Sequence, residues 1–368
     1  MKALILSTKT GQGHNSASHA LKASLEAKGH EAVVADILKS GTKNVSAPVS
    51  AMYDNLILHM PTVFGALYHA GELVSSSKHH SPIYYLNSIY CERLYNGIEK
   101  IAPQAIVCPH IFSAQAITRM CEKYGVHIPT IGIVTDYTCS PFWEETTLDA
   151  YIIPAPQLTD EFIKKGLPAH KLHPLGIPIS PRFKKKVSRE EARRIFGIQA
   201  EKVFVVLGGS MGYGCIPEVA EGLVKRQPDA QVAAVCGSNK KLYYSLKGIK
   251  NVLPFEYIEN VDVLMDAADV LITKPGGLSA TEAMAKRLPI VFSLPIPGGE
   301  ERNAEFLTSI GAAVYARKPE AAVNAATDLI QNPDRCAEMM KAQAKYINNH
   351  ADDDIAKLLI QMTERVGG

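Results

Sequence analysis

Residues 203–214 read VFVVLGGSMGYG, a run of five apolar residues that passes directly into a glycine-rich turn. The apolar run has the length of one buried strand, and a helical pattern follows the turn from about residue 217 to 224. Strand, glycine-rich turn and helix in this order open a βαβ unit, whose turn lies at the carboxyl end of a parallel strand. The stretch therefore predicts an α/β domain.

The first half of the chain follows the same order. An apolar run at 3–7 leads into the turn 10–15, TGQGHN, and then into a helical pattern between Ala17 and Leu25. Runs of this kind between helices are typical of parallel sheets that are covered on both faces. Further predicted strands are 32–36, 105–108, 130–134, 151–153, 232–237, 270–273 and 290–292.

The length of 368 residues suits two domains. Residues 175–182, LGIPISPR, contain two prolines and a glycine and are interpreted as the linker between them. We therefore expect two doubly wound, Rossmann-like α/β domains, each presenting a glycine-rich turn to a shared cleft.

Composition excludes several classes of protein. Lysine and arginine (39) nearly balance aspartate and glutamate (37), so there is no basic excess for nucleic acid. No apolar run reaches the roughly 18–20 residues of a membrane span, and the N-terminal run is too short for a signal peptide. The seven cysteines form no Cys-x-x-Cys pair, which argues against a zinc site or a disulfide framework. A cytoplasmic protein is expected.

The turn at 11–14, GQGH, is the first candidate site. It is similar to a dinucleotide fingerprint, and Asp36 ends the next strand where a ribose-binding acid would stand. A nicotinamide-dependent enzyme is therefore one interpretation of this half. That interpretation leaves His14 and the second glycine-rich turn at 208–214 unexplained.

Residues 273–284, TKPGGLSATEAM, are the second candidate. A strand ends, two glycines free the backbone, and a helix is expected to begin near Ser279. Helix N-terminal amides and a hydroxyl can hold a diphosphate, and Glu282 lies within reach of a sugar or ribose hydroxyl. The alternative is an ordinary helix capped by Ser279.

Residues 294–303, LPIPGGEERN, are the third. Their carboxylates and amide can hydrogen-bond sugar hydroxyls, although a solvated turn before a helix is the alternative. No Asp-x-Asp pair ends a strand, and the acidic run 352–354 lies in the C-terminal tail, where a solvated helix start is expected. No metal site is predicted.

Taken together, these motifs resemble those of the GT-B fold glycosyltransferases related to plant monogalactosyldiacylglycerol synthases and bacterial processive diacylglycerol glucosyltransferases. The resemblance covers nearly the whole chain. It rests on the motifs GQGH at 11–14, TDY at 135–137 with Trp143, GIP at 176–178, GGS at 208–210, KPGG at 274–277 and EERN at 300–303.

The resemblance implies an inverting hexosyltransferase that uses a UDP-hexose and no cofactor. His14 would be the acceptor-activating base or would orient the acceptor hydroxyl, with Asp136 as the second catalytic residue and Gly13, Tyr137 and Trp143 on the acceptor side. On the donor side, Gly209, Ser210, Gly276, Gly277 and Ser279 would surround the diphosphate, Tyr257 and Ile258 the uracil, Glu282 the ribose, and Glu300, Glu301 and Asn303 the sugar. The domains would be 1–178 for the acceptor and 179–345 for the donor, with 346–368 a helix packing back on the first.

Two departures from the relatives leave the substrates open. Relatives often have His where Ser140 stands, and Gln where Gly299 stands, which affects acceptor and donor sugar identity respectively. The expected acceptor is a lipid, most simply diacylglycerol, at the inner face of the plasma membrane. The alternatives are a polyprenyl-linked or small-molecule acceptor, or a different class of enzyme, a nucleotide-sugar epimerase.

An apolar and aromatic stretch at 53–90 bears on the lipid acceptor. Its helical face includes Leu67 and Tyr68, and Tyr84 to Leu86 follow the cations at 78–80. Domain packing explains such a face, and so does peripheral contact with a membrane, because aromatics beside cations suit the headgroup region.

Overall fold

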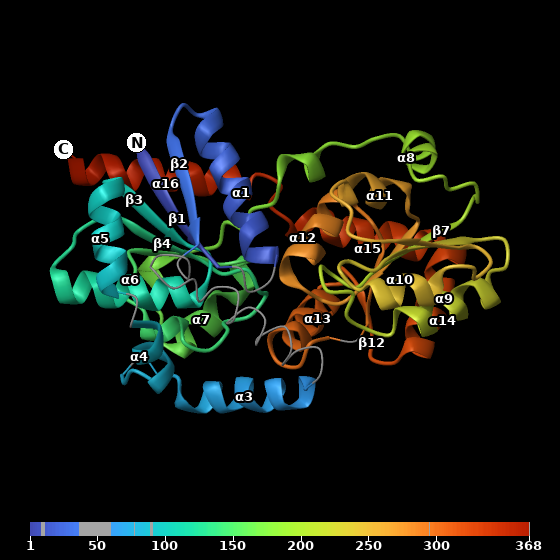
Figure 1. Ribbon diagram of the computed structural model, residues 1–368, viewed down its shortest axis with the longest axis horizontal. Helices are drawn as coiled ribbons and strands as arrows, with labels where there is room; N and C mark the ends of the chain where they lie inside the picture. The colour runs from blue at the N-terminus through green and yellow to red at the C-terminus, as the bar shows by residue number, and fades with distance from the viewer. Residues whose placement is uncertain (9–11, 37–59, 77, 89–90, 294, 368) are drawn as a thin grey trace. The chain divides into compact units, whose positions relative to one another are not determined.

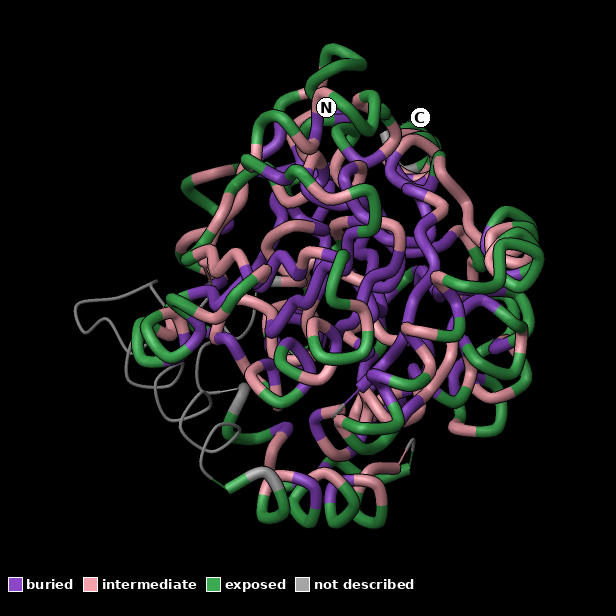
Figure 2. Tube along the Cα trace, turned by 90° about the vertical axis from the view of Figure 1, so that its right-hand side faces the viewer, coloured by how far each residue is buried: buried purple, intermediate pink, exposed green. Residues whose placement is uncertain are grey.

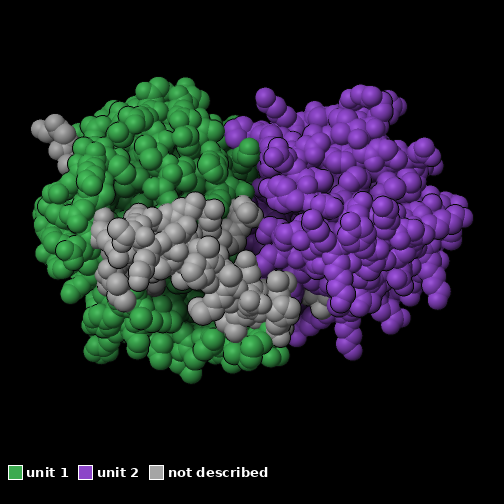
Figure 3. Space-filling view, in the orientation of Figure 1, with its two compact units in different colours: residues 1–180, 297–299, 348–368 green, residues 181–296, 300–347 purple. Residues whose placement is uncertain are grey.

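The computed structural model describes residues 1–8, 12–36, 60–76, 78–88, 91–293 and 295–367. They form two units (Figure 3). Unit 1 comprises Met1–Ser180, Pro297–Gly299 and Asn348–Gly368, and unit 2 comprises Pro181–Ile296 and Glu300–Ile347. The chain passes from one unit to the other between Ser180 and Pro181, inside the stretch 175–182.

Unit 1 contains a six-stranded sheet in the order β2-β1-β3-β4-β5-β6, and every pairing is parallel (Figure 1). Its described elements are β1 (Lys2–Ser7), α1 (Gln12–Ala27), β2 (Glu31–Asp36), α3 (Pro61–Val74), α4 (Pro82–Ser88), α5 (Cys91–Ile101), β3 (Ala105–Cys108), α6 (Ile111–Tyr124), β4 (Thr130–Ile133), η2 (Trp143–Glu145), β5 (Ala150–Ile152), η3 (Pro156–Leu158), α7 (Thr159–Lys165), η4 (Ala169–Lys171), β6 (Leu172–His173) and α16 (Ala351–Gly367).

The last helix, α16, belongs to the core of unit 1. Ile355, Ala356 and Leu359 are fully buried among residues of α1 and the sheet. Asp353 accepts hydrogen bonds from Ser24 (2.7 Å) and Lys28 (2.6 Å), and so ties the start of α16 to α1. The acidic run does begin a helix, but it is not uniformly solvated, because Asp352 is buried.

Unit 2 repeats the architecture, with the strand order β12-β11-β10-β7-β8-β9 and parallel pairing throughout. Its described elements are η5 (Pro181–Lys184), α8 (Arg189–Ile195), β7 (Val203–Leu207), α9 (Ile216–Arg226), β8 (Gln231–Val235), α10 (Lys240–Leu246), β9 (Val252–Phe255), α11 (Val261–Ala267), β10 (Val270–Thr273), α12 (Gly277–Lys286), β11 (Ile290–Ser293), α13 (Gly299–Ser309), β12 (Val314–Ala316), α14 (Pro319–Gln331) and α15 (Pro333–Tyr346).

The predicted fold class is confirmed, since both sheets are parallel and helices alternate with strands along the chain. The central strands β1, β3, β4, β7 and β10 are buried along nearly their whole length, as continuous apolar runs require. In Figure 2 the buried segments run through the interior, and the exposed ones lie at the outside. Two helices begin earlier than expected: α1 at Gln12 and α12 at Gly277.

Candidate active site

In each sheet the strand order reverses at one point between two neighbouring central strands. In unit 1 the chain moves outward from β1 to β2 and then returns to place β3 on the other side of β1. In unit 2 the same reversal occurs between β7 and β10. Loops at the carboxyl ends of two such strands diverge and leave a crevice, which is where open α/β sheets bind ligands. The predicted site residues His14, Gly209 and Gly276 follow β1, β7 and β10.

His14 lies in the first turn of α1, and its ring is held in one tautomer. Its Nδ1 is 2.9 Å from the carbonyl oxygen of Pro109, which follows β3. A carbonyl oxygen only accepts, so Nδ1 carries the proton of the neutral ring and Nε2 keeps a free lone pair. The hydroxyl of Thr135 lies 3.2 Å from the same Nδ1. A proton acceptor with a fixed orientation is therefore built between β1 and β3.

The electrostatic surroundings favour the neutral form of this ring. Burial lowers the pKa of His14, while the negative charge of Asp136 and the hydrogen bond to Pro109 raise it; the outcome lies below the usual value. A neutral imidazole at physiological pH can take up a proton, and Asp136 stabilises the cation that results. The structure thus brings the two predicted catalytic residues into electrostatic contact.

His110 is a residue that sequence reasoning missed. Its ring lies edge-on to that of His14, with ring centroids 4.5 Å apart. Its Nδ1 accepts a hydrogen bond from the amide of Phe112 (3.1 Å) and caps α6, so its proton is on Nε2. Burial, followed by the neighbouring His14, holds the pKa of His110 well below its usual range. The signal available in the sequence was its position two residues after the end of the predicted strand 105–108.

The remaining acceptor-side candidates divide by burial. Gly13 is in the first turn of α1 and half-buried. Tyr137 and Trp143 are only 5% and 4% exposed. The indole of Trp143 lies against β4, where a Cβ at Gly132 would come within 2.8 Å of it. Direct acceptor contact by Trp143 is not supported by this placement in the core.

In unit 2 the turn after β7 carries Gly209 and Ser210. The turn is folded tightly onto the residues that follow β8: Ser238 donates to the carbonyl of Ser210 (2.9 Å), and a Cβ at Gly212 would lie 2.3 Å from the carbonyl oxygen of Cys236. Gly212 has a φ of +62°, so both space and conformation require glycine there. Gly209 and Ser210 remain half-buried on this rigid turn.

The turn after β10 opens α12. Gly276 is the N-cap residue and has no side chain to cap the helix. The alternative of a helix capped by Ser279 is therefore wrong, because Ser279 lies within the helix. The N-terminal amides of α12, beginning at Gly277, have no side-chain cap and carry the positive end of the helix dipole. Such an end suits an anionic group.

Glu282 lies one turn further along α12 and is 8% exposed. Burial raises its pKa to about 8; the charge of Arg182 opposes the shift, and that of Asp262 adds to it. A protonated carboxyl group both donates and accepts hydrogen bonds, which suits a ribose diol as well as the predicted carboxylate would.

The predicted sugar-binding residues Glu300, Glu301 and Asn303 all lie in α13. Glu300 forms an ion pair with Lys274, and its other oxygen accepts from the amide of Ile296 (2.8 Å). Asn303 is fully buried and donates to the carbonyl of Pro275 (3.0 Å), so it supports the turn after β10. Glu301 is half-buried.

Tyr257 and Ile258 lie between β9 and α11. Tyr257 is 61% exposed and Ile258 is half-buried. Both therefore have surface available to a ligand, and their predicted contact with a uracil base remains a prediction.

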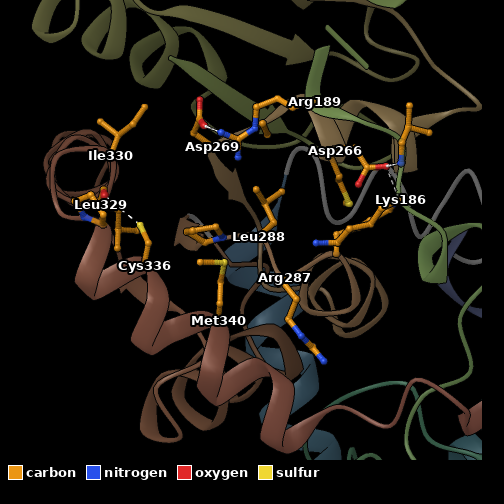
Figure 4. A pocket seen from close by; sticks show the side chains of 16 residues that line it. Lys186, Arg189, Asp266, Asp269, Arg287, Leu288, Leu329, Ile330, Cys336 and Met340 are labelled. Atoms are coloured by element: carbon orange, nitrogen blue, oxygen red, sulfur yellow. Dashed lines mark hydrogen bonds and ion pairs between the residues drawn. The ribbon is translucent and has the colours of Figure 1, made fainter. Parts of the chain in front are cut away.

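A pocket of about 510 Å³ in unit 2 lies away from these turns (Figure 4). Its lining includes Asp269 and Pro289, which precede β10 and β11, so it is at the amino ends of the strands. Asp269 pairs with Arg189 (2.8 Å), and Asp266 with Lys286 (2.6 Å). The first pair joins the start of α8 to the loop between α11 and β10, and the second joins α11 to the end of α12, so both have a structural role.

The described residues contain no cluster of three or more His, Cys, Asp or Glu side chains arranged for a metal ion. Within the same residues, no helix has the length and apolar character needed to cross a membrane.

Comparison with known proteins assigns both halves of the chain. Residues 14–179 match the family model of monogalactosyldiacylglycerol (MGDG) synthase, and residues 203–359 match the C-terminal domain of glycosyltransferase family 28. A processive diacylglycerol beta-glucosyltransferase of Bacillus pumilus is 26% identical over 373 residues, which cover 99% of this chain and 96% of the relative.

Solved structures show the same fold. MurG of Acinetobacter baumannii superposes with a TM-score of 0.64 at 15% identity, covering 98% of this chain and 99% of that one. The UDP-GlcNAc 2-epimerase of Neisseria meningitidis superposes with a TM-score of 0.63 at 13% identity, covering 98% and 100%. The fold alone therefore does not separate a transferase from an epimerase, but the sequence matches do.

The chain is a glycosyltransferase with two Rossmann-like domains of the GT-B type. Within that class it is a family 28 enzyme, homologous to the processive diacylglycerol glucosyltransferases. The nicotinamide interpretation of the turn at 11–14 is thereby replaced.

Proposed function

We propose that this enzyme transfers a hexose from a UDP-sugar to the hydroxyl group of a lipid acceptor, diacylglycerol, with inversion at the anomeric carbon. The observation that carries the proposal is the fixed tautomer of His14 in a domain that matches the MGDG synthase model. The name of the B. pumilus relative supports the choice of diacylglycerol.

On the acceptor side, Nε2 of His14 takes the proton of the acceptor hydroxyl as its oxygen bonds to the anomeric carbon. The bond from that carbon to the β-phosphate oxygen breaks on the opposite face, and UDP leaves with the electron pair. Burial keeps His14 neutral beforehand, and Asp136 stabilises the imidazolium afterwards. The imidazolium then loses this proton to solvent, which restores the neutral base.

On the donor side, the turns after β7 and β10 supply amides that lie at the reversal point of the unit 2 sheet. The leaving diphosphate gains negative charge in the transition state. Preorganised amides and the N-terminus of α12 stabilise this charge without reorganisation of solvent. Glu282, Glu300 and Glu301 are proposed to bind the ribose and sugar hydroxyls, and Tyr257 with Ile258 the base.

A surface of unit 1 supports a lipid acceptor. Leu67, Leu73 and Val74 of α3 are 58%, 88% and 51% exposed, and Leu86 of α4 is 61% exposed. The exposed residues 78–80, Lys-His-His, lie between these helices. We call Leu67, Leu73, Val74 and Leu86 the exposed apolar surface. Apolar side chains beside cations suit contact with phospholipid headgroups, and we propose peripheral contact with the inner face of the plasma membrane here.

Tyr84 and residues 53–59 and 89–90, from the same stretch of sequence, are not counted in the exposed apolar surface. Tyr84 is fully buried, stacks on His80 and donates to Glu122 (3.1 Å), so it packs within unit 1. Residues 53–59 and 89–90 lie outside the described part of the chain. The membrane proposal therefore rests on α3 and α4 alone.

The test is a matched transfer assay. Purified protein receives radiolabelled UDP-glucose, UDP-galactose or UDP-N-acetylglucosamine, each with diacylglycerol in mixed micelles. We expect label to enter the organic phase with one donor, which identifies the sugar. Binding of UDP without any labelled lipid would disprove the diacylglycerol acceptor and favour a polyprenyl-linked or small-molecule one.

A further inference from the structure

Lys274 follows β10 directly and stands among the glycine-rich turns of unit 2. Its alkyl chain runs over Gly209, where an added Cβ would come within 3.0 Å of Cε. A Cβ at Gly276 would lie 3.7 Å from the ammonium nitrogen. The absence of side chains at these two glycines therefore leaves the ammonium group between the turn after β7 and the turn after β10.

The partner of this ammonium group is Glu300, from the start of α13. The side chains of Lys274 and Glu300 are 21% and 13% exposed, so the pair is largely withdrawn from water. The second oxygen of Glu300 is held by the amide of Ile296 (2.8 Å). Burial, and then the negative charge of Glu300, raises the pKa of the nearby Tyr213, which keeps its phenol protonated.

An unpaired charge at a partly buried position costs free energy, and a partner of opposite charge offsets part of that cost. In this pair a carboxylate oxygen occupies the position of an anion beside an ammonium group, two glycine turns and a helix N-terminus. All four features suit a phosphate oxygen equally well. The carboxylate of Glu300 therefore resembles a substitute for a ligand phosphate.

We propose that Lys274 is the cation that binds the diphosphate of the donor nucleotide, and that Glu300 neutralises it in the empty site and is displaced on binding. The inference rests on the proposed function and deepens it, since it names the charged group at the phosphate subsite and gives Glu300 a role before the donor binds, in addition to its proposed sugar contact. Among the described residues, Lys274 places its ammonium group between the turn after β7 and the turn after β10.

Calorimetry with the full chain tests the proposal, using UDP and uridine as probes. Lys274→Met should lower UDP affinity at least tenfold and leave uridine affinity unchanged, because uridine has no phosphate. Lys274→Arg should restore most of the UDP affinity. Glu300→Gln should raise UDP affinity severalfold, because the ammonium group loses its competing partner. Lys225→Met, an exposed lysine of α9, is the matched control and should change neither affinity.

Equal losses for UDP and uridine in Lys274→Met would mean that the lysine only supports the fold, and would overturn the inference. Unchanged UDP affinity in that variant, or weakened UDP binding in Glu300→Gln, would overturn it too. In each of these cases UDP binding by the natural chain leaves the proposed function standing. Failure of the natural chain to bind UDP would overturn the proposed function and the inference together.

Discussion

The Nδ1 of His14 donates to the carbonyl oxygen of Pro109 across 2.9 Å, and this contact joins the loops that follow β1 and β3. It orients the ring through the backbone, which no side-chain substitution at residue 109 removes. The free Nε2 is a consequence of this contact and not of a neighbouring carboxylate. The contact therefore makes His14 the first residue to test.

Replacing His14 by alanine should lower turnover by about 10²–10⁴-fold, the usual contribution of a general base. UDP affinity should stay within a factor of about two, because the predicted donor residues belong to unit 2. Steady-state transfer and calorimetry on the same preparation measure the two quantities. Substantial remaining turnover would show that His14 is not the base, and Asp136 would then be the next candidate.

The pH dependence of turnover separates the roles of His14 and Asp136. The pKa of His14 is lowered from its usual value of 6.5, so activity should be full at neutral pH and fall only on acidification below that value. Asp136→Asn removes a negative charge that raises this pKa, so the acidic limb of the profile should move to lower pH.

The turnover of Asp136→Asn at neutral pH decides whether His14 or Asp136 is the base. A modest reduction at neutral pH fits a residue that only stabilises the imidazolium. If Asp136→Asn instead lowers turnover by the same large factor at every pH, so that the acidic limb of the remaining activity does not shift, Asp136 is the base.

Glu282 makes the stability of unit 2 depend on pH. Its pKa is about 8 in the folded chain against an ordinary 4.5, so between these values the folded state holds a proton that the unfolded state has released. Stability should therefore fall as the pH rises through this window, with a slope of at most about 1.4 kcal/mol per pH unit for one proton. Glu282→Gln has no such proton.

We expect Glu282→Gln to unfold at a higher temperature than the natural chain at pH 8–9, and at nearly the same temperature at pH 4–5. Thermal unfolding followed by circular dichroism across this range is the measurement. The prediction fails if the variant and the natural chain keep a constant difference at all pH values, because burial would then not be perturbing the carboxyl group.

Much of the fold could be predicted because the central strands are buried on both faces and read as continuous apolar runs. The strands that were missed, β6, β9 and β12, are the outer strands of their sheets. Their sequences are short or mixed, and β9 contains Pro254, which an edge strand tolerates because one side of its backbone is unpaired. Edge strands lack the two-sided burial that gives a strong signal.

The loops that form the site could be predicted from the sequence, but the contacts between those loops could not. Glycine-rich turns after strands identify positions near a ligand, because parallel strands end at one edge of a sheet. The tautomer of His14, the ring contact with His110 and the pairing of Lys274 with Glu300 depend on distances between loops that are remote in sequence. Trp143 was placed on the acceptor side by the family resemblance, and its burial against β4 could not be predicted from the sequence.

The transfer reaction should proceed without a divalent metal ion. The proposed stabilisation of the leaving diphosphate comes from amides, a helix N-terminus and Lys274, so a metal has no required role in it. Turnover measured in excess EDTA, after dialysis against the chelator, should equal that of the untreated enzyme. Strict dependence on added Mg²⁺ or Mn²⁺ would disprove this account of the donor site.

The exposed apolar surface should govern binding to vesicles. Leu73→Glu and Leu86→Glu place negative charge on α3 and α4, where burial in a headgroup layer would be costly, and so should reduce co-sedimentation with anionic phospholipid vesicles severalfold. Ile195→Glu is the matched control, because Ile195 is also an exposed apolar residue (46%) but lies in unit 2. Transfer to diacylglycerol in vesicles should fall in parallel, while calorimetric affinity for UDP stays unchanged. If all three variants bind vesicles like the natural chain, α3 and α4 are not the membrane contact and the exposed leucines need another explanation.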